Sequence, residues 1–348
     1  MPPMGRYILS LNIFLKPSQF LCVIAKPLGA LNTQELRLTL NRRTAPLSQT
    51  LTWQQASLSM GARVYLILET NEQVGGFVHT FDGQNFDCTN GPVLEWDQPE
   101  TASRHLATFA HAVSKLSPRF QSLSIAPRWE SALASQRIQT LPIEPSDILE
   151  AATLQVPIEK TRKDQVQRAT PRLRRTLARA EKAGVETYWS QVSTHQLPEF
   201  VLNMQQFGQH KGFYVPSLEW FQALVTPTAI AQDEGISFFL AEAAIRSNTP
   251  SQQVLRKTQL LIALTPHHLY YLFGCDVKNG DEHCPSTAAS AHFRVLEESA
   301  KLGQTLYDLN GYTHPQSGEP SYRGVSLFKE QFGGQIVSYL CPQYFIST

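Results

Sequence analysis

Hydrophobic and polar positions follow the same order of strand-like and helix-like patterns twice along the chain. In the first series, residues 62–69 and 75–81 are rich in apolar and β-branched side chains on either side of a polar turn, which is typical of paired strands. Residues 101–116 place apolar side chains at helical spacing, and residues 122–127 form a short apolar run that ends at a proline. This series predicts a strand pair, a helix and a further strand.

The second series begins at residue 235. Apolar runs over 235–245, 259–265 and 268–275 predict strands, and an amphipathic helix follows. The helix is expected to end at Gly303, because a residue without Cβ adopts positive φ at low cost. Residues 305–309 then predict another strand. Because the order repeats, the chain is predicted to contain two related α/β units rather than one.

A proline-rich segment and a basic helix separate the two series. Residues 142–157 contain three prolines and are predicted to link the two halves. Residues 160–182 then hold nine Lys and Arg but only two Asp and Glu, with an apolar stripe at helical spacing. The arginine-bearing side of this helix is either a solvated face or a phosphate-binding surface, and both interpretations stay open. Two further amphipathic helices are predicted over 197–209 and 218–224.

Residues 295–335 carry the side chains best placed for chemistry. Asp308 stands at the end of a predicted strand before the turn dipeptide Asn310-Gly311, so its carboxylate either acts on a substrate group or caps the turn. Lys329 lies between two phenylalanines on a short predicted helix that stops at Gly333-Gly334, a pair we expect to let the backbone approach a ligand. Taken alone, Lys329 has the simpler interpretation of an exposed helix lysine.

Composition limits the class of protein. A hydrophobic content of 42% and a charged content of 17% are typical of a globular protein, and 348 residues suggest two domains. The net charge of +1 argues against DNA as a partner and requires any RNA contact to be local. The five cysteines lack paired spacing, which fits a reducing compartment and offers no metal site. Residues 1–24 are expected to be a ragged N-terminal segment, too short in its apolar run to span a membrane.

Four short motifs, taken together and in order, resemble the FemABX family of aminoacyltransferases. They are YYLFGC, the helix end AKLG, YDLNG and LFKEQFGG. The family pattern has a Tyr-rich strand, a helix ending in Ala-Lys-x-x-Gly or similar, Tyr-Asp-x-x-Gly and Phe-Lys-x-x-Phe-Gly-Gly. No single motif is specific, but their order and spacing are.

The resemblance implies an α/β (α+β) fold of two tandem domains like those of acyl-CoA N-acyltransferases (GNAT-like domains), in the short FemX-like form without a coiled-coil insertion. The first domain would span residues 25–155 with the C-terminal strand 335–348, and the second 156–334. The implied activity moves an amino acid from aminoacyl-tRNA to a UDP-linked or lipid-linked muramyl peptide, in the cytoplasm and without a cofactor. A lipid-linked acceptor would allow peripheral membrane association.

Functional residues are carried over from the family only where its motifs match this sequence. Lys329 and Asp308 are the catalytic candidates, with Lys329 as the fixed cation of the site. Two positions depart from the FemX branch: Gln54 follows Trp53 where a phosphate-binding lysine is expected, and Ala126 stands where an acid precedes the proline. The candidates for substrate binding are Phe328, Tyr271, His210, Lys211, Gln49, Trp53, Arg174 and Arg175.

Two other functions stay open. An acyl-CoA N-acyltransferase shares the fold, but it normally needs a glycine-rich phosphate loop, and no Gly-x-Gly occurs in this sequence. A non-catalytic module of cell-envelope polysaccharide assembly is favoured by the two departures on the acceptor side. Motifs of serine hydrolases, zinc proteases and P-loop proteins are absent from the sequence.

Overall fold

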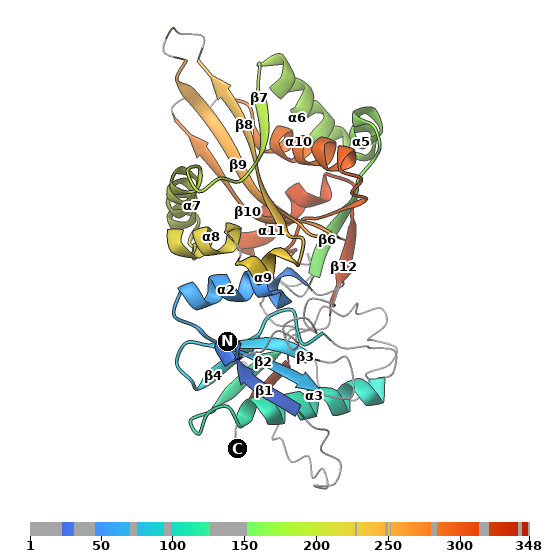
Figure 1. Ribbon diagram of the computed structural model, residues 1–348. Coiled ribbons are helices and arrows are strands. Elements are labelled where there is room, and N and C mark those ends of the chain that lie inside the picture. The colour runs from blue at the N-terminus through green and yellow to red at the C-terminus, as the bar shows by residue number, and fades with distance from the viewer. Residues whose placement is uncertain are drawn as a thin grey trace, which may run out of the picture. The chain divides into compact units, whose positions relative to one another are not determined.

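The chain forms two compact units, each with its own sheet (Figure 1). The first unit comprises Met1–Ala151 and Ser338–Thr348, and the second comprises Ala152–Val337. This computed structural model describes residues 23–30, 46–69, 75–93, 99–125, 152–226, 228–247, 250, 252–266, 268–279, 284–312, 320–339 and 343–346. The expected N-terminal segment, residues 1–24, lies almost entirely outside the described residues.

The first unit contains a six-stranded sheet in the order β1-β2-β3-β4-β5-β13. Neighbouring strands are antiparallel except β4 and β5, which are parallel and joined through α3. The elements are β1 (Val23–Pro27), η2 (Leu28–Ala30), η3 (Leu47–Gln49), α2 (Leu51–Ser59), β2 (Arg63–Glu69), β3 (Gly75–Thr80), β4 (Asn85–Cys88), α3 (Pro99–Ser114), β5 (Ser122–Ile125) and β13 (Gln343–Ile346).

The core of the first unit lies between the sheet and α3. The predicted apolar face of this helix is confirmed: Leu106, Phe109, Ala110 and Val113 are buried against strand residues such as Leu123. The helix forms because these positions recur every three or four residues, and its apolar stripe needs the sheet to cover it.

The C-terminal end of the chain supplies strands to both sheets. The strand expected over residues 336–340 is β12 (Gln335–Ser338), which adjoins β6 (Ala152–Pro157) in the sheet of the second unit. A separate strand, β13, pairs with β5 of the first unit, with Gln343 opposite Ile125 and Ile346 opposite Ser122. The tail therefore completes the first sheet with residues beyond the predicted strand.

Deletion of residues 342–348 should destabilise the first unit. Without β13, β5 becomes an open edge and loses its backbone partners on that side. We expect the free energy of unfolding to fall by about 1–2 kcal/mol, or the melting temperature by on the order of 5 °C. Hydrogen exchange at Ser122–Ile125 should become faster. A variant lacking only Ser347 and Thr348 is the control. Unchanged exchange at β5 would contradict the prediction.

The second unit contains a seven-stranded sheet in the order β12-β6-β11-β10-β9-β8-β7. Again one central pair, β10 and β11, is parallel and is joined through a helix, α10. The remaining elements are β6 (Ala152–Pro157), α5 (Arg162–Arg168), α6 (Pro171–Lys182), β7 (Glu186–Gln191), α7 (Leu197–Lys211), α8 (Leu218–Val225), α9 (Ala229–Gln232), β8 (Ser237–Arg246), β9 (Val254–Leu264), β10 (Leu269–Lys278), α10 (Ala288–Lys301), β11 (Leu306–Asp308) and α11 (Pro320–Glu330).

Helices cover both faces of this second sheet (Figure 1). On one face, α6 and α10 share a core with the strands and with Phe332. On the other, Trp220 and Phe221 of α8 pack edge-on against Phe273 of β10, with ring centroids 5.7 and 5.0 Å apart. Because helices cover both faces of the sheet, its central strands carry nearly continuous hydrophobic runs.

Comparison of the two units confirms the predicted internal repeat. Each has antiparallel strands followed by a parallel pair that is connected through one helix. Two local predictions need correction. Residues 152–157 of the expected linker form β6, because they pair with β11. The single basic helix is two helices, because Pro171 cannot continue α5 and instead occupies the first turn of α6.

No helix in the described parts of the chain is both long and apolar enough to cross a membrane.

Candidate functional site

The candidate site of the second unit lies at the junction of β10, β11 and α11. The parallel pairing sets Tyr270 opposite Asp308, the last residue of β11. The chain then turns through Asn310 and Gly311, with φ of 50° and 41°. Asn and Gly tolerate this left-handed region better than other residues, so the turn dipeptide recognised in the sequence makes the turn. Lys329 approaches this turn from the last turn of α11.

Lys329 is a buried cation held by backbone carbonyls. Its side chain is only 6% exposed. The ammonium donates to the carbonyl oxygens of Asn310 and Gly311, the latter at 2.8 Å, and it lies 5.7 Å from the ring centroid of Tyr271. Burial lowers the pKa of Lys329 to about 8, although the nearby charge of Asp308 acts to raise it. The simpler expectation of an exposed helix lysine is therefore wrong, and the group is mainly protonated at neutral pH.

Asp308 holds the turn that faces Lys329. Its Oδ1 accepts from the backbone N–H of Asn310 at 2.8 Å and from the hydroxyl of Thr153 on β6. These bonds realise the capping role considered for Asp308 from the sequence. The carboxylate also favours the cationic form of Lys329 through its charge. A direct action of Asp308 on a substrate amine stays a prediction.

An aromatic cluster surrounds the apolar side of the site. Tyr271, Phe328 and Phe332 all contact His292 of α10, with ring centroids 5.1, 5.7 and 5.2 Å from the imidazole. Phe328 is partly buried and packs edge-on against Phe332 at 5.3 Å. Rings packed in this way limit the access of water to the apolar side of Lys329.

His292 is a site residue that the sequence interpretation missed. Its Nδ1 lies 2.9 Å from the hydroxyl of Tyr307, and the side chain is buried. Burial lowers the pKa of His292 to about 3, and the charge of Lys329 lowers it further, so the imidazole is neutral at neutral pH. The available signal was its place on the apolar face of α10 beside Val295 and Leu296, where a histidine is usually part of the core.

Replacement of His292 by Gln should flatten the acid side of the stability curve. The pKa in the folded state lies below the value of an unfolded chain, so only the unfolded state gains a proton as pH falls through about 6.5 toward 3. The free energy of unfolding of wild type should then fall by on the order of a few kcal/mol between pH 6.5 and 4, and the variant should not show this fall. Thermal melts across this range test it, with exposed His195→Gln as control. Parallel curves for wild type and His292→Gln would contradict it.

The glycine pair after Lys329 brings the backbone close to the chain itself. Gly333 has φ of +73°, and a Cβ there would overlap the carbonyl oxygen of Arg168. A Cβ on Gly334 would lie 2.6 Å from the carbonyl oxygen of Gln155 on β6. The expectation that this pair lets the backbone approach a ligand is therefore replaced by a packing role, which fixes the end of α11 against β6 and α5.

Comparison with solved structures gives the architecture a context. The chain superposes on the crystal structure of FemX with a TM-score of 0.65 and 15% identity, covering 93% of this chain and 97% of that one. It also matches a tandem GNAT protein from the clavulanic acid biosynthesis pathway, with a TM-score of 0.51, 12% identity, and coverage of 93% and 98%. The fold is tandem GNAT-like, similar to that of FemX. No family model and no curated protein sequence matches the chain.

The FemX-like fold confirms the predicted fold class and, at the level of architecture, the resemblance to the FemABX family. Within it, Tyr271, Asp308, Phe328 and Lys329 come together around one turn. These four residues come from three of the four motifs, and AKLG ends helix α10, which contributes His292.

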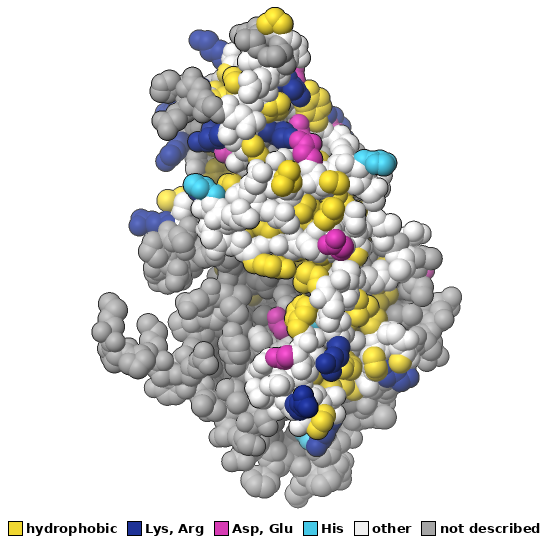
Figure 2. All heavy atoms as spheres, turned by 90° about the vertical axis from the view of Figure 1, so that its left-hand side faces the viewer, with side chains coloured by type: hydrophobic (Ala, Val, Ile, Leu, Met, Phe, Trp, Pro, Cys, Tyr) yellow, Lys and Arg dark blue, Asp and Glu magenta, His cyan; other side chains and the backbone are white. Residues whose placement is uncertain are grey.

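His210 and Lys211 lie apart from this cluster. Both are exposed at the C-terminal end of α7, and Lys211 packs over the ring of Phe207 at 6.0 Å. The side of the second unit that carries α7 faces the viewer in Figure 2, where Lys, Arg and His side chains stand out as separate groups. A cation at a helix C-terminus is stabilised by the helix dipole, which accounts for Lys211 without a ligand. Their role in substrate binding stays a prediction.

Gln49 and Trp53 belong to the first unit. The amide of Gln49 is buried and bonded to the backbone: its Nε2 donates to the carbonyl oxygen of Thr89 at 2.8 Å, and its Oε1 accepts from the N–H of Phe77 at 2.8 Å. Gln49 thus joins β3 to the segment before Gly91. Trp53 is half-buried in the first turn of α2. Binding of substrate by either side chain stays a prediction.

Arg174 and Arg175 are exposed on α6. The stripe of Leu173, Leu177 and Ala180 faces the core, as predicted, so the arginines point outward. This basic face stays a candidate for binding phosphate groups.

Proposed function

We propose that this protein is an aminoacyltransferase that moves an amino acid from aminoacyl-tRNA onto the amine of a peptidoglycan precursor peptide. The observation that carries the proposal is the buried ammonium of Lys329, held by two carbonyls and flanked by aromatic rings in a tandem GNAT-like fold. A fixed cation in a water-poor site stabilises negative charge more strongly than the same group in water.

The reaction needs one bond to form and one to break. The acceptor amine attacks the ester carbonyl carbon of the aminoacyl group, and negative charge develops on the carbonyl oxygen. The intermediate collapses with loss of the ribose oxygen, which takes up a proton as the amide forms and the amine loses one. Lys329 lies ready to stabilise either oxygen, since two of its N–H groups bind backbone carbonyls and one remains for the substrate.

The pKa of Lys329 suits this role. A value of about 8 keeps the group cationic at neutral pH while making its proton easier to donate to the leaving oxygen. Asp308 supports the cationic state through its charge, and it holds the Asn310 turn through a hydrogen bond to the N–H of that residue. The neutral imidazole of His292 adds no competing positive charge on the aromatic side.

Aminoacyl-tRNA is favoured over acyl-CoA as donor. The whole sequence contains no Gly-x-Gly, the glycine-rich loop that normally holds the pyrophosphate of acyl-CoA at a helix N-terminus. Thr287, at the start of α10, instead bonds Thr258 of β9 at 2.7 Å. The reaction requires no cofactor besides the co-substrate, and we place it in the cytoplasm, where both substrates would meet.

A transfer assay tests the proposal. The full chain is incubated with radiolabelled mixed aminoacyl-tRNAs or with labelled acetyl-CoA, and with a UDP-linked muramyl pentapeptide or the corresponding lipid-linked precursor in vesicles. We expect label to move from tRNA to one of the two acceptors. Recovery of label with the vesicle-bound acceptor alone would establish peripheral membrane association as part of the function.

Two results would replace the proposal. Transfer from acetyl-CoA alone would make the protein an acyl-CoA N-acyltransferase. Binding of either precursor without transfer from any donor would favour the non-catalytic module, which the departures at Gln54 and Ala126 already suggest on the acceptor side.

A further inference from the structure

Four cations form a stripe along the outer side of α6. Arg172, Arg175, Arg179 and Lys182 are all exposed and are separated by three, four and three residues, so they follow one side of the helix. At a rise of 1.5 Å per residue the stripe is about 15 Å long. We call Arg172, Arg175, Arg179 and Lys182 the α6 stripe.

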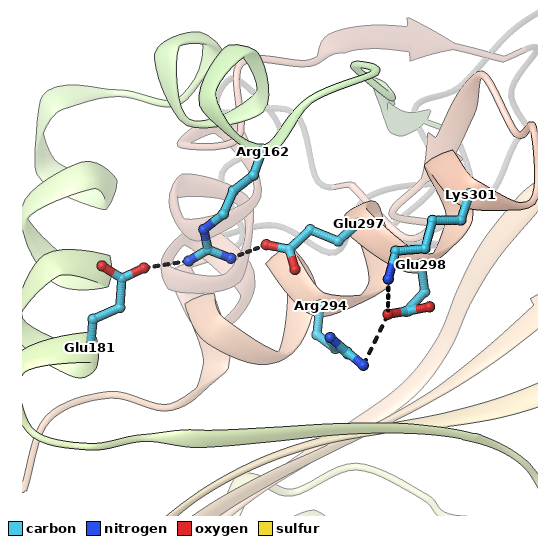
Figure 3. A network of polar contacts seen from close by, with 6 residues as sticks. All are labelled: Arg162, Glu181, Arg294, Glu297, Glu298 and Lys301. Atoms are coloured by element: carbon cyan, nitrogen blue, oxygen red, sulfur yellow. Dashed lines mark hydrogen bonds and ion pairs between the residues drawn. The ribbon is translucent and has the colours of Figure 1, made fainter.

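Among the residues that the structure describes, the α6 stripe has no acidic partner, whereas Arg162 and Arg168 of α5 have such partners. Figure 3 shows the guanidinium of Arg162 between Glu181 of α6 and Glu297 of α10. Arg168 likewise pairs with Glu159. Within the described residues, no acid forms an ion pair with a member of the stripe. The fold therefore uses Arg162 and Arg168 internally and leaves the four stripe charges to the solvent.

Helix stability accounts for only part of this arrangement. The helix dipole favours Arg179 and Lys182 in the last turn of α6, but it disfavours Arg172 in the first turn, next to Pro171. Like charges three or four residues apart also repel one another, by roughly 0.2–0.5 kcal/mol per pair. Because the net charge of the whole chain is only +1 while residues 160–182 hold nine basic and two acidic side chains, the remainder is net acidic. The stripe is thus a local, uncompensated positive surface.

The α6 stripe begins next to the segment that carries Lys329. Thr170 caps α6, and its backbone N–H donates to the carbonyl oxygen of Gln331 at 2.9 Å, two residues beyond Lys329. Gly333 then packs directly against the backbone of Arg168. A polyanion that lies along the stripe would therefore have one end beside the backbone of the reactive lysine.

The chemistry of the stripe favours a nucleic-acid backbone over a lipid surface. Three of its four members are arginines, whose planar fork binds phosphate oxygens in pairs. A helix that docks on a membrane presents large apolar side chains beside its cations. On the exposed side of α6 the non-polar residues are only Pro171 and Ala178, while its larger apolar side chains, Leu173 and Leu177, are buried.

We propose that the α6 stripe binds the sugar-phosphate backbone of the tRNA donor near its acceptor end, independently of base sequence. This inference rests on the proposed function, which makes tRNA a co-substrate. It adds a place and a binding mode: Arg172, Arg175 and Arg179 contact phosphates, and Lys182 extends the contact. The binding should therefore depend strongly on salt, because each phosphate contact releases counterions.

The test compares two variants that lose the same charge. Arg172→Gln/Arg175→Gln/Arg179→Gln removes three stripe cations, and Lys115→Gln/Arg119→Gln/Lys278→Gln removes three exposed cations elsewhere. Binding of deacylated tRNA is measured by filter retention from 50 to 200 mM salt. We expect the stripe variant to bind about tenfold or more weakly and its log–log salt slope to fall by about 2–3, since each contact contributes about 0.7–0.9. The control variant should match wild type.

Kinetics and vesicles complete the test. In the transfer assay, the stripe variant should raise KM for aminoacyl-tRNA about tenfold, with kcat and KM for the acceptor unchanged. Wild-type affinity and salt slope in the stripe variant, or no tRNA binding by wild type, would overturn the inference. So would retained tRNA binding combined with lost binding to anionic phosphatidylglycerol vesicles. If the stripe variant loses tRNA binding while wild type transfers no amino acid, the inference stands and the proposed function fails.

Discussion

Replacement of Lys329 by Met should lower kcat for aminoacyl transfer by on the order of 10² to 10³-fold or more, with the fold intact. Loss of one preorganised group that stabilises an oxyanion has an effect of this size. Met is an unbranched, flexible side chain that matches Lys as far as Cε. Removing the charge of a 6% exposed residue relieves a burial cost that offsets the two lost hydrogen bonds. Steady-state kinetics measures the fall in kcat, and thermal melts test whether the fold is intact.

A matched control and the direction of pH dependence sharpen this prediction. Exposed Lys301, which pairs with Glu298, is the control, and Lys301→Met should transfer at the wild-type rate. If Lys329 acts as a cation, kcat/KM of wild type falls as pH rises through about 8, approaching tenfold per pH unit, because the ammonium is then lost. A rate that rises through pH 8 would mean that the free amine acts as a base. Full activity of Lys329→Met would remove the lysine from the mechanism.

Replacement of Gly333 by Ala should destabilise the second unit by about 2–4 kcal/mol, or on the order of 10 °C in melting temperature. The backbone has φ of +73°, which strains any residue with a Cβ, and the new methyl group would overlap the carbonyl oxygen of Arg168. The backbone fixes the positions of both overlapping atoms, the new Cβ and the carbonyl oxygen of Arg168. No side-chain rotation can therefore relieve the overlap. The end of α11 would have to shift, and Lys329 with it.

Gly184→Ala separates the steric part of this effect from the backbone strain. Gly184 has nearly the same φ, +74°, but a Cβ there would meet no atom within 4 Å. This control should lose only about 1 kcal/mol. Calorimetric melts measure the stability of both variants. Equal losses of stability in Gly333→Ala and Gly184→Ala would mean that contact with Arg168 contributes nothing, and that the glycine pair has no packing role.

The predictable parts of this protein are those that depend on neighbours in sequence. Apolar residues every three or four positions predict α3 within a few residues of its observed bounds, and they predict the end of α10 near Gly303, because a helix must bury one stripe. Asn310-Gly311 marked its turn because the conformation is intrinsic to those residue types. Pro171 is the local signal that divides the basic segment into two helices.

Contacts between distant residues decided the rest. Thr153 and Asp308 are 155 positions apart, and the sheet order alone brings them into hydrogen-bond contact. The burial that makes Lys329 a perturbed cation, and that keeps His292 neutral, arises from packing of α10 and α11 on one sheet. Likewise, Arg162 and Arg168 differ from the α6 stripe only because acids from other segments reach them. By itself, the sequence determined the elements, their repetition and the residues able to do chemistry. Only the tertiary structure decided which charges are buried, paired or exposed, because solvation and Coulomb energies depend on distances that periodicity does not contain.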